Sequence, residues 1–263
     1  MNAPLDGRVH PTAIVDPAAR IAADVEIGPY AVIGPGVELA PGCRIGAHAV
    51  VTGDTRIGAN CRIFQFASIG EIPQDKKYGG EPTRLEIGAG NTIREFCTVN
   101  CGTRQGGGVT RVGDDNWIMA YVHIAHDCQI GSRTIFANNA QLAGHVVVGD
   151  DAILGGFTVV HQFCRIGAHA ITGMGTIVLQ DIPPYVKASG NPARPYGING
   201  EGLARRGFDA AAVATLKRAY RSLYRAGLTL EAARKAIAEQ VQDHPEVTIL
   251  AEFLAAEGRG IIR

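Results

Sequence analysis

The stretch HIAHDCQIG, residues 123–131, gathers four side chains that can bind a proton or a metal ion. His123 and His126 are three residues apart, Asp127 follows directly, and Cys128 comes next. A neutral imidazole can remove a proton from a hydroxyl near neutral pH, and imidazole is also a preferred ligand of zinc. These nine residues fit an acid–base site, a metal site or a polar surface, so the periodicity of the surrounding chain has to decide.

Apolar residues recur at every sixth position through most of the chain. Every sixth residue is apolar from Val15 to Ile69, from Ile87 to Val99 and from Val112 to Val178, with Thr172 the single exception. A glycine follows many of them, which suits corners where φ is positive or space is tight. This period matches neither an α-helix nor an alternating strand. It is typical of a β-solenoid, in which three six-residue sides close one triangular coil.

Two polar segments, residues 70–84 and 102–108, interrupt this register, and the second shifts its phase by one residue. We expect both to be loops that project from the coils, where functional residues are often found. The repeat fades after Val178 into a proline-rich segment that we expect to be a linker. The prediction is therefore a β-helix over residues 1–190 and a linker with a helical subdomain over residues 191–263.

The tail of the chain changes to a helical period from about Phe208. Apolar residues then step by three or four positions, and Gly227 is a plausible stop for the first helix. Thr229 is suited to cap a second helix, and Pro245 is suited to open a third. The tail is therefore expected to be a small α-helical subdomain.

The period brings histidines together. Ile124, Leu142 and Val160 are one coil of 18 residues apart, and His126, His145 and His161 follow them closely. At a coil rise of about 4.8 Å, these three histidines should lie on one face within roughly 10–15 Å.

Three functions compete for this cluster. His126 could be a general base; three histidines could bind zinc, as in a gamma-class carbonic anhydrase; or the side chains could be surface polar groups. Whether Asp127 orients His126 stays open, since neighbours on a strand face opposite ways.

Composition excludes several classes of function. Lys and Arg together number 25, as do Asp and Glu, so no net charge attracts nucleic acid or a membrane surface. The N-terminus lacks a basic start with an apolar run, and no stretch is long enough to span a bilayer, which predicts a cytoplasmic protein. The six cysteines are expected to be buried and unpaired. The glycine pairs at 88–90 and 173–175 stay in the six-residue register and are expected to be corners, not a dinucleotide loop.

Several segments resemble those of the UDP-N-acetylglucosamine acyltransferases. They are QFASIGEIPQDKKYGGEPTRLEIG, HIAHDCQIG, NNAQLAGHVVVGDD, GGFTVVHQFCRIGAHA, EGLARRGF and PEVTILAEF. The resemblance covers essentially the whole chain. It implies a left-handed parallel β-helix and a homotrimer with active sites between subunits. It also implies transfer of an (R)-3-hydroxyacyl group from acyl carrier protein to the 3-hydroxyl of UDP-N-acetylglucosamine, the first step of lipid A synthesis, without a metal or redox cofactor.

The resemblance also implies roles for single residues. His126 would be the general base, Asp127 would support it, and the N–H of Gly144 would stabilise the oxyanion of the tetrahedral intermediate. The residues implied to bind the sugar, the acyl hydroxyl group or the nucleotide, or to shape the pocket, are Gln74, Asp75, Lys77, His123, His145, His161, Gln162, Asn199, Glu201 and Arg205.

Two further features concern the acyl donor. A basic strip with three residues four apart suits docking of an acidic carrier protein, although a solvated helix face has the same pattern. Its residues are Lys217, Arg218, Arg221 and Arg225, with Arg206 nearby. Met174 stands where some members of the family have glycine. Its side chain would shorten the acyl groove and favour a chain of about ten carbons over a longer one.

Overall fold

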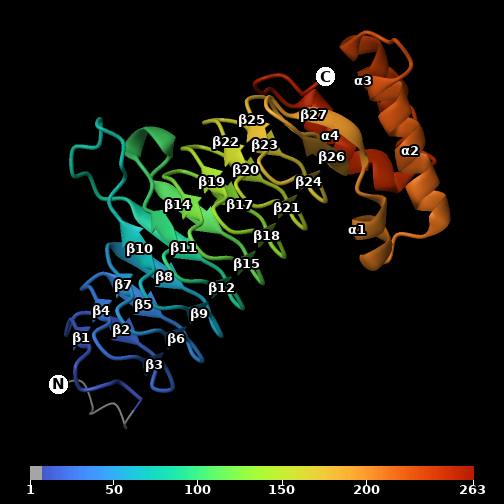
Figure 1. The fold of residues 1–263 in the computed structure, drawn as a ribbon. Coiled ribbons are helices and arrows are strands. Elements are labelled where there is room, and N and C mark those ends of the chain that lie inside the picture. Colours follow the sequence, from blue (N-terminus) through green and yellow to red (C-terminus); the bar gives the residue numbers. More distant parts are fainter. Residues whose placement is uncertain (1–7) are drawn as a thin grey trace.

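Short parallel strands wind into a three-sided β-helix that ends in a group of helices (Figure 1). The computed structural model describes residues 8–263. The prediction that the N-terminus is not a signal peptide concerns residues 1–7 in part, and these lie outside the described residues. Successive strands pair in parallel with the strands one coil away, as Ile124 does with Leu142.

Three sheets form the sides of the prism. Sheet 1 has nine strands: β1 (Ile14–Val15), β4 (Val32–Ile33), β7 (Val50–Val51), β10 (Ser68–Glu71), β13 (Thr98–Asn100), β16 (His123–Ile124), β19 (Gln141–Leu142), β22 (Val159–Val160) and β25 (Ile177–Val178). Sheet 2 has eight: β2 (Arg20–Ile21), β5 (Val37–Leu39), β8 (Asp54–Ile57), β11 (Arg84–Ile87), β14 (Val109–Val112), β17 (Gln129–Ile130), β20 (Val147–Val148) and β23 (Arg165–Ile166). Sheet 3 has ten: β3 (Glu26–Ile27), β6 (Arg44–Ile45), β9 (Arg62–Ile63), β12 (Thr92–Ile93), β15 (Trp117–Ile118), β18 (Ile135–Phe136), β21 (Ile153–Leu154), β24 (Ile171–Thr172), β26 (Val186–Ser189) and β27 (Arg194–Ile198).

The apolar residues of the six-residue period fill the interior of the prism. Ile63, Ile124 and Leu142, for example, are at most 2% exposed. Thr172, the exception in the sequence, is also buried. Its Oγ1 lies 2.8 Å from Oγ1 of Thr158 and accepts the N–H of Gly155 at 3.0 Å, so the buried hydroxyl has partners.

The corners between sheets need both tight space and positive φ, but at different positions. At Gly46, a Cβ would lie 2.6 Å from the backbone nitrogen of Gln65 in the next coil, so lack of space requires glycine. The positive φ falls two residues later, on His48 and its equivalents in other coils, which are mostly not glycine. We call the corner between sheets 1 and 2 the first corner, that between sheets 2 and 3 the second, and that between sheets 3 and 1 the third.

The segment expected to be a linker forms two strands instead. β26 continues sheet 3 in parallel with β24, and β27 then turns back antiparallel to β26. Pro195 lies in β27, which is the edge strand of its sheet and therefore tolerates a residue without an N–H. Prolines in this segment thus mark the end of the coil pattern, and the sheet extends past the predicted boundary at residue 190.

The helices follow the β-helix. They are α1 (Gly200–Arg205), α2 (Ala210–Tyr224), α3 (Leu230–Ala238), the 3-10 turn η2 (Pro245–Val247) and α4 (Thr248–Ala255). Thr229 caps α3 and Pro245 opens η2, as the sequence predicts, whereas α1 was not expected. In the described part of the chain, no helix has the length and apolarity that crossing a bilayer requires.

Candidate active site

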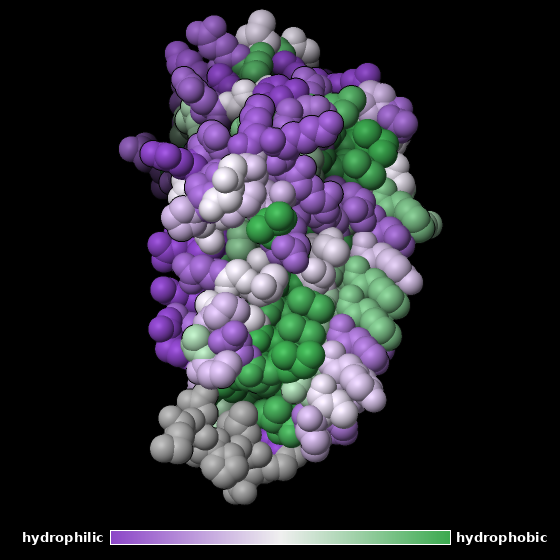
Figure 2. Space-filling model, turned by 90° about the vertical axis from the view of Figure 1, so that its left-hand side faces the viewer, coloured by the Kyte–Doolittle hydropathy of each residue, from purple (hydrophilic) through white to green (hydrophobic). Residues whose placement is uncertain are grey.

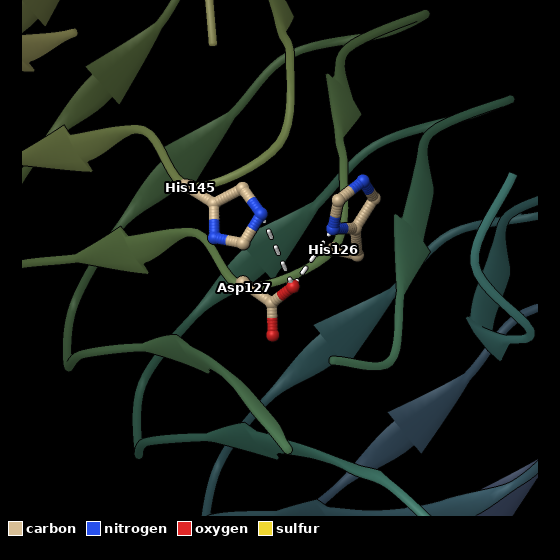
Figure 3. A group of neighbouring side chains, drawn as sticks. All are labelled: His126, Asp127 and His145. Atoms are coloured by element: carbon tan, nitrogen blue, oxygen red, sulfur yellow. Dashed lines mark hydrogen bonds and ion pairs between the residues drawn. The ribbon is translucent and has the colours of Figure 1, made fainter. Parts of the chain in front are cut away.

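His126 and Asp127 lie together at the first corner (Figure 3). Asp127 has a φ of 61°, in the left-handed region. The strand geometry that would turn neighbouring side chains to opposite faces is therefore lost at this residue. Nδ1 of His126 lies 2.8 Å from Oδ2 of Asp127, so the carboxylate contacts the imidazole.

The Asp127 carboxylate is surrounded by donors. Its side chain is 1% exposed. Thr103 donates its N–H to Oδ1 at 2.8 Å and its hydroxyl to Oδ2 at 2.6 Å, and the N–H of Asp127 donates to Oγ1 of Thr110 at 2.8 Å. Since a buried carboxylate accepts from Nδ1 of His126, Nδ1 carries the proton and Nε2 keeps its lone pair. His126 can therefore accept a proton at Nε2.

His145 belongs to the same corner, one coil further on. Its Nε2 lies 3.7 Å from Oδ2 of Asp127, its ring stands edge-on to that of His126, and it stacks on Phe163. Burial is the main cause that lowers the pKa of His145. His145 is thus kept neutral near pH 7, so it can shape and hydrogen-bond a polar substrate beside His126 without adding a positive charge.

His123 flanks the pair from β16. Its Nδ1 lies 2.7 Å from Oγ1 of Thr98. Burial lowers the pKa of His123, with a further contribution from the charge of His126. His126 thus has two neighbouring imidazoles, His123 and His145, whose pKa values are both lowered by burial.

Gly144 lies directly against the imidazole of His126. A Cβ at this position would be 2.5 Å from Cε1 of His126, so a larger residue would displace the ring. The N–H of Gly144 donates no hydrogen bond to any of residues 8–263. A free N–H beside a base is the arrangement that an oxyanion donor needs.

Within residues 8–263, His161 makes no hydrogen bond, ion pair or ring contact with His126, Asp127 or His145. It is exposed and follows Val160 directly, before the chain reaches the corner, and its Nδ1 lies 3.1 Å from the carbonyl oxygen of Gln162. The predicted convergence is confirmed for His126 and His145, whose ring centroids lie 5.1 Å apart, and it stays a prediction for His161. Gln162 is exposed as well.

The first loop, residues 72–83, carries Gln74, Asp75 and Lys77. Gln74 and Lys77 are exposed, and Oδ1 of Asp75 accepts the N–H of Lys77 at 3.0 Å. The charge of Asp75 acts on the pKa of His145, in the direction that raises it, so this loop approaches the histidine cluster.

Helix α1 places its residues elsewhere in the same chain. Asn199 is buried and caps α1: its Oδ1 accepts the N–H of Gly202 at 3.2 Å, and its Nδ2 donates to the carbonyl of His169 at 3.1 Å. Glu201 and Arg205 are exposed on α1. Among the described residues, no contact joins α1 to His126 or Asp127, so a single chain does not bring the predicted nucleotide residues to the predicted base.

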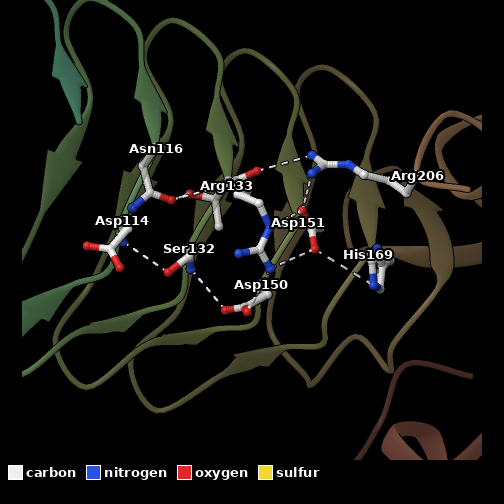
Figure 4. A network of polar contacts seen from close by, with 9 residues as sticks. Asp114, Asn116, Ser132, Arg133, Asp150, Asp151, His169 and Arg206 are labelled. Atoms are coloured by element: carbon white, nitrogen blue, oxygen red, sulfur yellow. Dashed lines mark hydrogen bonds and ion pairs between the residues drawn. The ribbon is translucent and has the colours of Figure 1, made fainter. Parts of the chain in front are cut away.

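Arg206 forms an ion pair at the second corner (Figure 4). Its guanidinium pairs with the carboxylate of Asp151 and donates to the carbonyl of Arg133 at 3.2 Å. Asp151 is largely buried and also accepts from Nε of Arg133 at 3.0 Å. Arg206 is therefore paired within its own chain, and its part in carrier-protein docking stays a prediction. The remaining residues of the strip are all exposed: Lys217, Arg218 and Arg221 lie on α2, and Arg225 is its C-cap.

Thr103 and Thr110 were not predicted as site residues. Thr103 lies in the second loop, residues 102–108, whose length shifts the phase of the repeat by one residue. That shift was the only sequence signal that this loop differs from an ordinary insertion.

The cluster could hold a metal ion only by giving up its hydrogen bonds. The ligand atoms of His126, Asp127 and His145 lie within 4.8 Å of one another. Oδ2 of Asp127, however, already accepts from the Thr103 hydroxyl and from His126. This donor set is arranged to orient an imidazole and stabilise its protonated form, which is the requirement of a general base.

Comparison with known proteins gives consistent matches. A family model described as "Udp N-acetylglucosamine O-acyltransferase; Domain 2" matches residues 181–262, and one described as "Bacterial transferase hexapeptide (six repeats)" matches residues 18–53 and 110–144. The chain is 64% identical over 255 residues to the acyl-[acyl-carrier-protein]–UDP-N-acetylglucosamine O-acyltransferase of Thiobacillus denitrificans, covering 97% of this chain and 99% of the relative.

Solved structures agree. UDP-N-acetylglucosamine acyltransferase of Francisella novicida has a TM-score of 0.95 at 41% identity, covering 97% of this chain and 94% of that one. LpxA of Acinetobacter baumannii also has a TM-score of 0.95, at 47% identity, covering 97% and 100%. The similarity therefore includes both the β-helix and the helices that follow it.

Proposed function

The chain belongs to the UDP-N-acetylglucosamine O-acyltransferases, left-handed parallel β-helix enzymes of lipid A biosynthesis, and we propose that His126 is the base of their reaction here. The reaction moves an (R)-3-hydroxyacyl group from acyl carrier protein to the 3-hydroxyl of UDP-N-acetylglucosamine. One observation carries the residue assignment: a buried carboxylate fixes His126 beside a glycine whose N–H is free. The comparisons give no support for the alternative, a zinc-dependent hydratase.

The geometry supports a direct transfer. Nε2 of His126 takes the proton of the sugar hydroxyl as the oxygen attacks the acyl carbonyl of the thioester, and Asp127 stabilises the imidazolium that results. The N–H of Gly144 donates to the oxyanion of the tetrahedral intermediate. When the intermediate collapses, the thiol of the carrier protein leaves and takes the proton from His126. His126 thus ends each cycle neutral.

The outer faces of the β-helix differ in polarity in a way that supports a homotrimer. Sheet 2 carries a ladder of alternating charge, in which Glu38 pairs with Arg20 and Arg56, and Glu86 pairs with Arg111. Such a face is well solvated. By contrast, Figure 2 shows hydrophobic residues gathered on the lower half of the face that carries sheet 1.

The apolar surface continues around the third corner. The outward residues at the N-terminal end of sheet 1 are Ile14, Val32 and Val50. At the third corner, the rings of Tyr30, His48, Phe66, Phe96 and Tyr121 stack, and the tyrosines and phenylalanines are about half exposed. Contiguous exposed apolar surface of this kind marks a protein interface. We assign it to contact between subunits.

A trimer also accounts for helix α1. Glu201 and Arg205 do not reach the histidine cluster of their own chain, so a site between subunits would take them, with His161 and Gln162, from a neighbour. Arg205 suits the phosphates because its planar fork offers paired donors. Mixing inactive His126→Ala and Arg205→Ala subunits should then restore part of the activity, because some mixed sites receive both residues. Absence of any restoration in refolded mixtures would contradict shared sites.

The exposed cations of α2 suit the carrier protein. Lys217, Arg221 and the C-cap residue Arg225 are spaced four residues apart along α2, whose other face packs through Leu216 and Leu223. Reversing these three charges should raise KM for acyl carrier protein and leave KM for UDP-N-acetylglucosamine unchanged. Equal effects on both substrates would contradict docking at this strip.

Met174 supports a preference for a shorter acyl chain. Met174 is 78% exposed at the third corner, so the described residues leave most of it uncovered. A neighbouring subunit placed against this corner would enclose Met174 at the end of an acyl groove. The Met174→Gly variant should then prefer a longer donor, and an unchanged preference would contradict this role.

We also expect the enzyme to act in the cytoplasm. All six cysteines are free and buried, which suits a reducing compartment. This expectation is tested by cell fractionation.

The proposed function is tested by incubating the purified protein with UDP-N-acetylglucosamine and (R)-3-hydroxyacyl carrier proteins of different chain length, beside His126→Ala. Acylated nucleotide sugar from the wild type, lost in the variant, would establish the reaction and the base together. If no donor gives product while the protein is folded, the assignment is wrong for this chain.

A further inference from the structure

The second loop closes over the carboxylate of Asp127. Thr103 approaches it with both its N–H and its hydroxyl, at 2.8 and 2.6 Å. At Gly106, a Cβ would lie only 2.0 Å from Cγ of Asp127, and at Gly102 only 2.9 Å from Oδ1. The loop therefore touches the carboxylate at three positions, and two of these positions have room only for glycine.

Thr103 also holds the loop itself in shape. Its Oγ1 accepts the N–H of Gly106 at 3.2 Å and so caps the 3-10 turn η1 (Arg104–Gly106). Arg104, the first residue of this turn, donates its N–H to Oε1 of Glu81 in the first loop at 3.4 Å. The same hydroxyl thus orders the loop and donates to Asp127.

We propose that Thr103 is a positioning residue for the acyl transfer, which holds Asp127 in the orientation that aligns His126 and limits how tightly the His126–Asp127 pair binds a proton. The proposal rests on the proposed function for its kinetic readout only. Thr103 does not reach the position of Nε2, where the substrate hydroxyl would bind, so it acts through Asp127.

The direction of the effect follows from burial. Oδ2 of Asp127 shares its charge between the hydroxyl of Thr103 and Nδ1 of His126. Without the hydroxyl, the buried carboxylate keeps fewer donors, so the pair gains more by binding a proton. Removing the hydroxyl should therefore raise the affinity of the hydrogen-bonded pair for a proton.

Among residues 8–263, the other charged or titratable groups that act on the pair lie at the same corner and on three neighbouring segments. They are Cys128 beside Asp127, His145 in the next coil, His123 on β16 and Asp75 on the first loop. Removing the Thr103 hydroxyl changes none of them, so a change in the proton affinity of the pair would come from Thr103.

The test compares Thr103→Val, which keeps the shape and removes the hydroxyl, with Thr103→Ser, which restores it. Thr134→Val is the matched control, because Thr134 is also buried and donates its hydroxyl to Oδ1 of Asn116 at 2.6 Å, at the second corner. Thr103→Val should lower kcat/KM by about 10- to 100-fold, mainly through kcat, and move its acidic limb to higher pH. Thr103→Ser should recover most of the activity, and Thr134→Val should leave the acidic limb in place.

A second readout does not depend on activity. The pKa of His126 is measured by NMR on histidine labelled at Cε1, with the His126→Gln spectrum identifying its signal among the eight histidines. A higher pKa in Thr103→Val supports the proposal, and a pKa and acidic limb equal to those of the wild type overturn it. If Thr103→Val does not fold, Gly106→Ala pushes the loop away from the carboxylate and should shift the pKa in the same direction. If the wild type gives no acylated product, the proposed function fails, while the NMR comparison still decides the role of Thr103.

Discussion

The first and second corners of the β-helix each hold a buried aspartate at the same backbone position, with different partners. Asp127 and Asp151 both have a φ of 61°, and both lie near a histidine. Asp127 is held by the neutral groups of Thr103 and by His126. Asp151 is held by two guanidinium groups, those of Arg133 and Arg206.

The difference shows what turns a carboxylate–histidine pair into a base. Two permanent cations neutralise Asp151. Nε2 of His169 lies 3.9 Å from Oδ2 of Asp151, and the ring of His169 stacks on Tyr185. Within residues 8–263, no lysine or arginine forms an ion pair with Asp127, so its charge remains able to stabilise an imidazolium. The second corner therefore fixes α1 to the β-helix, whereas the first corner can exchange a proton.

The largest expected difference between the corners concerns their histidines. Replacing His126 with alanine should lower kcat by about 10²- to 10⁴-fold, because the general base is lost. His169→Phe keeps a ring that can stack on Tyr185 and should change kcat less than threefold, in keeping with a role away from the reacting atoms. Steady-state kinetics on both variants check this, and equal losses would remove the distinction between the two corners.

A smaller effect is expected when each carboxylate becomes an amide. Asp127→Asn should lower kcat by about 10- to 100-fold, since a charged hydrogen bond to the imidazolium is lost. Asp151→Asn should instead lower the free energy of unfolding by about 1–3 kcal/mol, because both arginines lose a charged partner. Chemical denaturation and kinetics on the two variants are the measurements. A loss of kcat with Asp151→Asn at full stability would show that the second corner takes part in the reaction.

The smallest expected effect is on the pH dependence of stability. Burial is the main cause that lowers the pKa of His169, against the opposing charge of Asp151 and together with those of Arg206 and Arg133. A histidine with a lowered pKa binds fewer protons in the folded state, so stability is full above the unfolded pKa of about 6.5 and falls as pH drops below it. His169→Phe should reduce the loss of Tm between pH 7.5 and 5.5 by about 1–4 °C. An identical loss in both proteins would show that other groups cause it.

The sequence predicted the elements that depend on local periodicity. The six-residue period placed Ile124 and Leu142 in the same sheet of neighbouring coils, and His126 and His145 then had to be close. Thr229 as the cap of α3 depends on local backbone chemistry alone, and it was predicted too.

What the sequence did not reveal depends on backbone conformation and long-range contacts. The Asp127 side chain points toward His126 because the φ of Asp127 is positive. The alternating pattern of a β-strand does not predict a positive φ. Thr103 contacts Asp127, which is 24 residues later in the sequence. The loop that carries Thr103 is shaped by hydrogen bonds within the loop itself. Arg206 looked like a surface cation because its partner, Asp151, is 55 residues away.

The strand that turns back at the end of the β-helix also affects how the molecule behaves at high concentration. If the parallel coils simply stopped, each of the three sheets would expose a row of unpaired N–H and C=O groups. Another chain could pair with these groups and extend the stack into a filament. Here β27 runs antiparallel along sheet 3, Gly190 and Ala193 continue the bonding of β25, and Asp181 bridges to Ile261 beyond sheet 2. At this end sheets 1 and 2 thus meet irregular segments and sheet 3 ends in an antiparallel strand, so head-to-tail stacking of parallel coils is disfavoured.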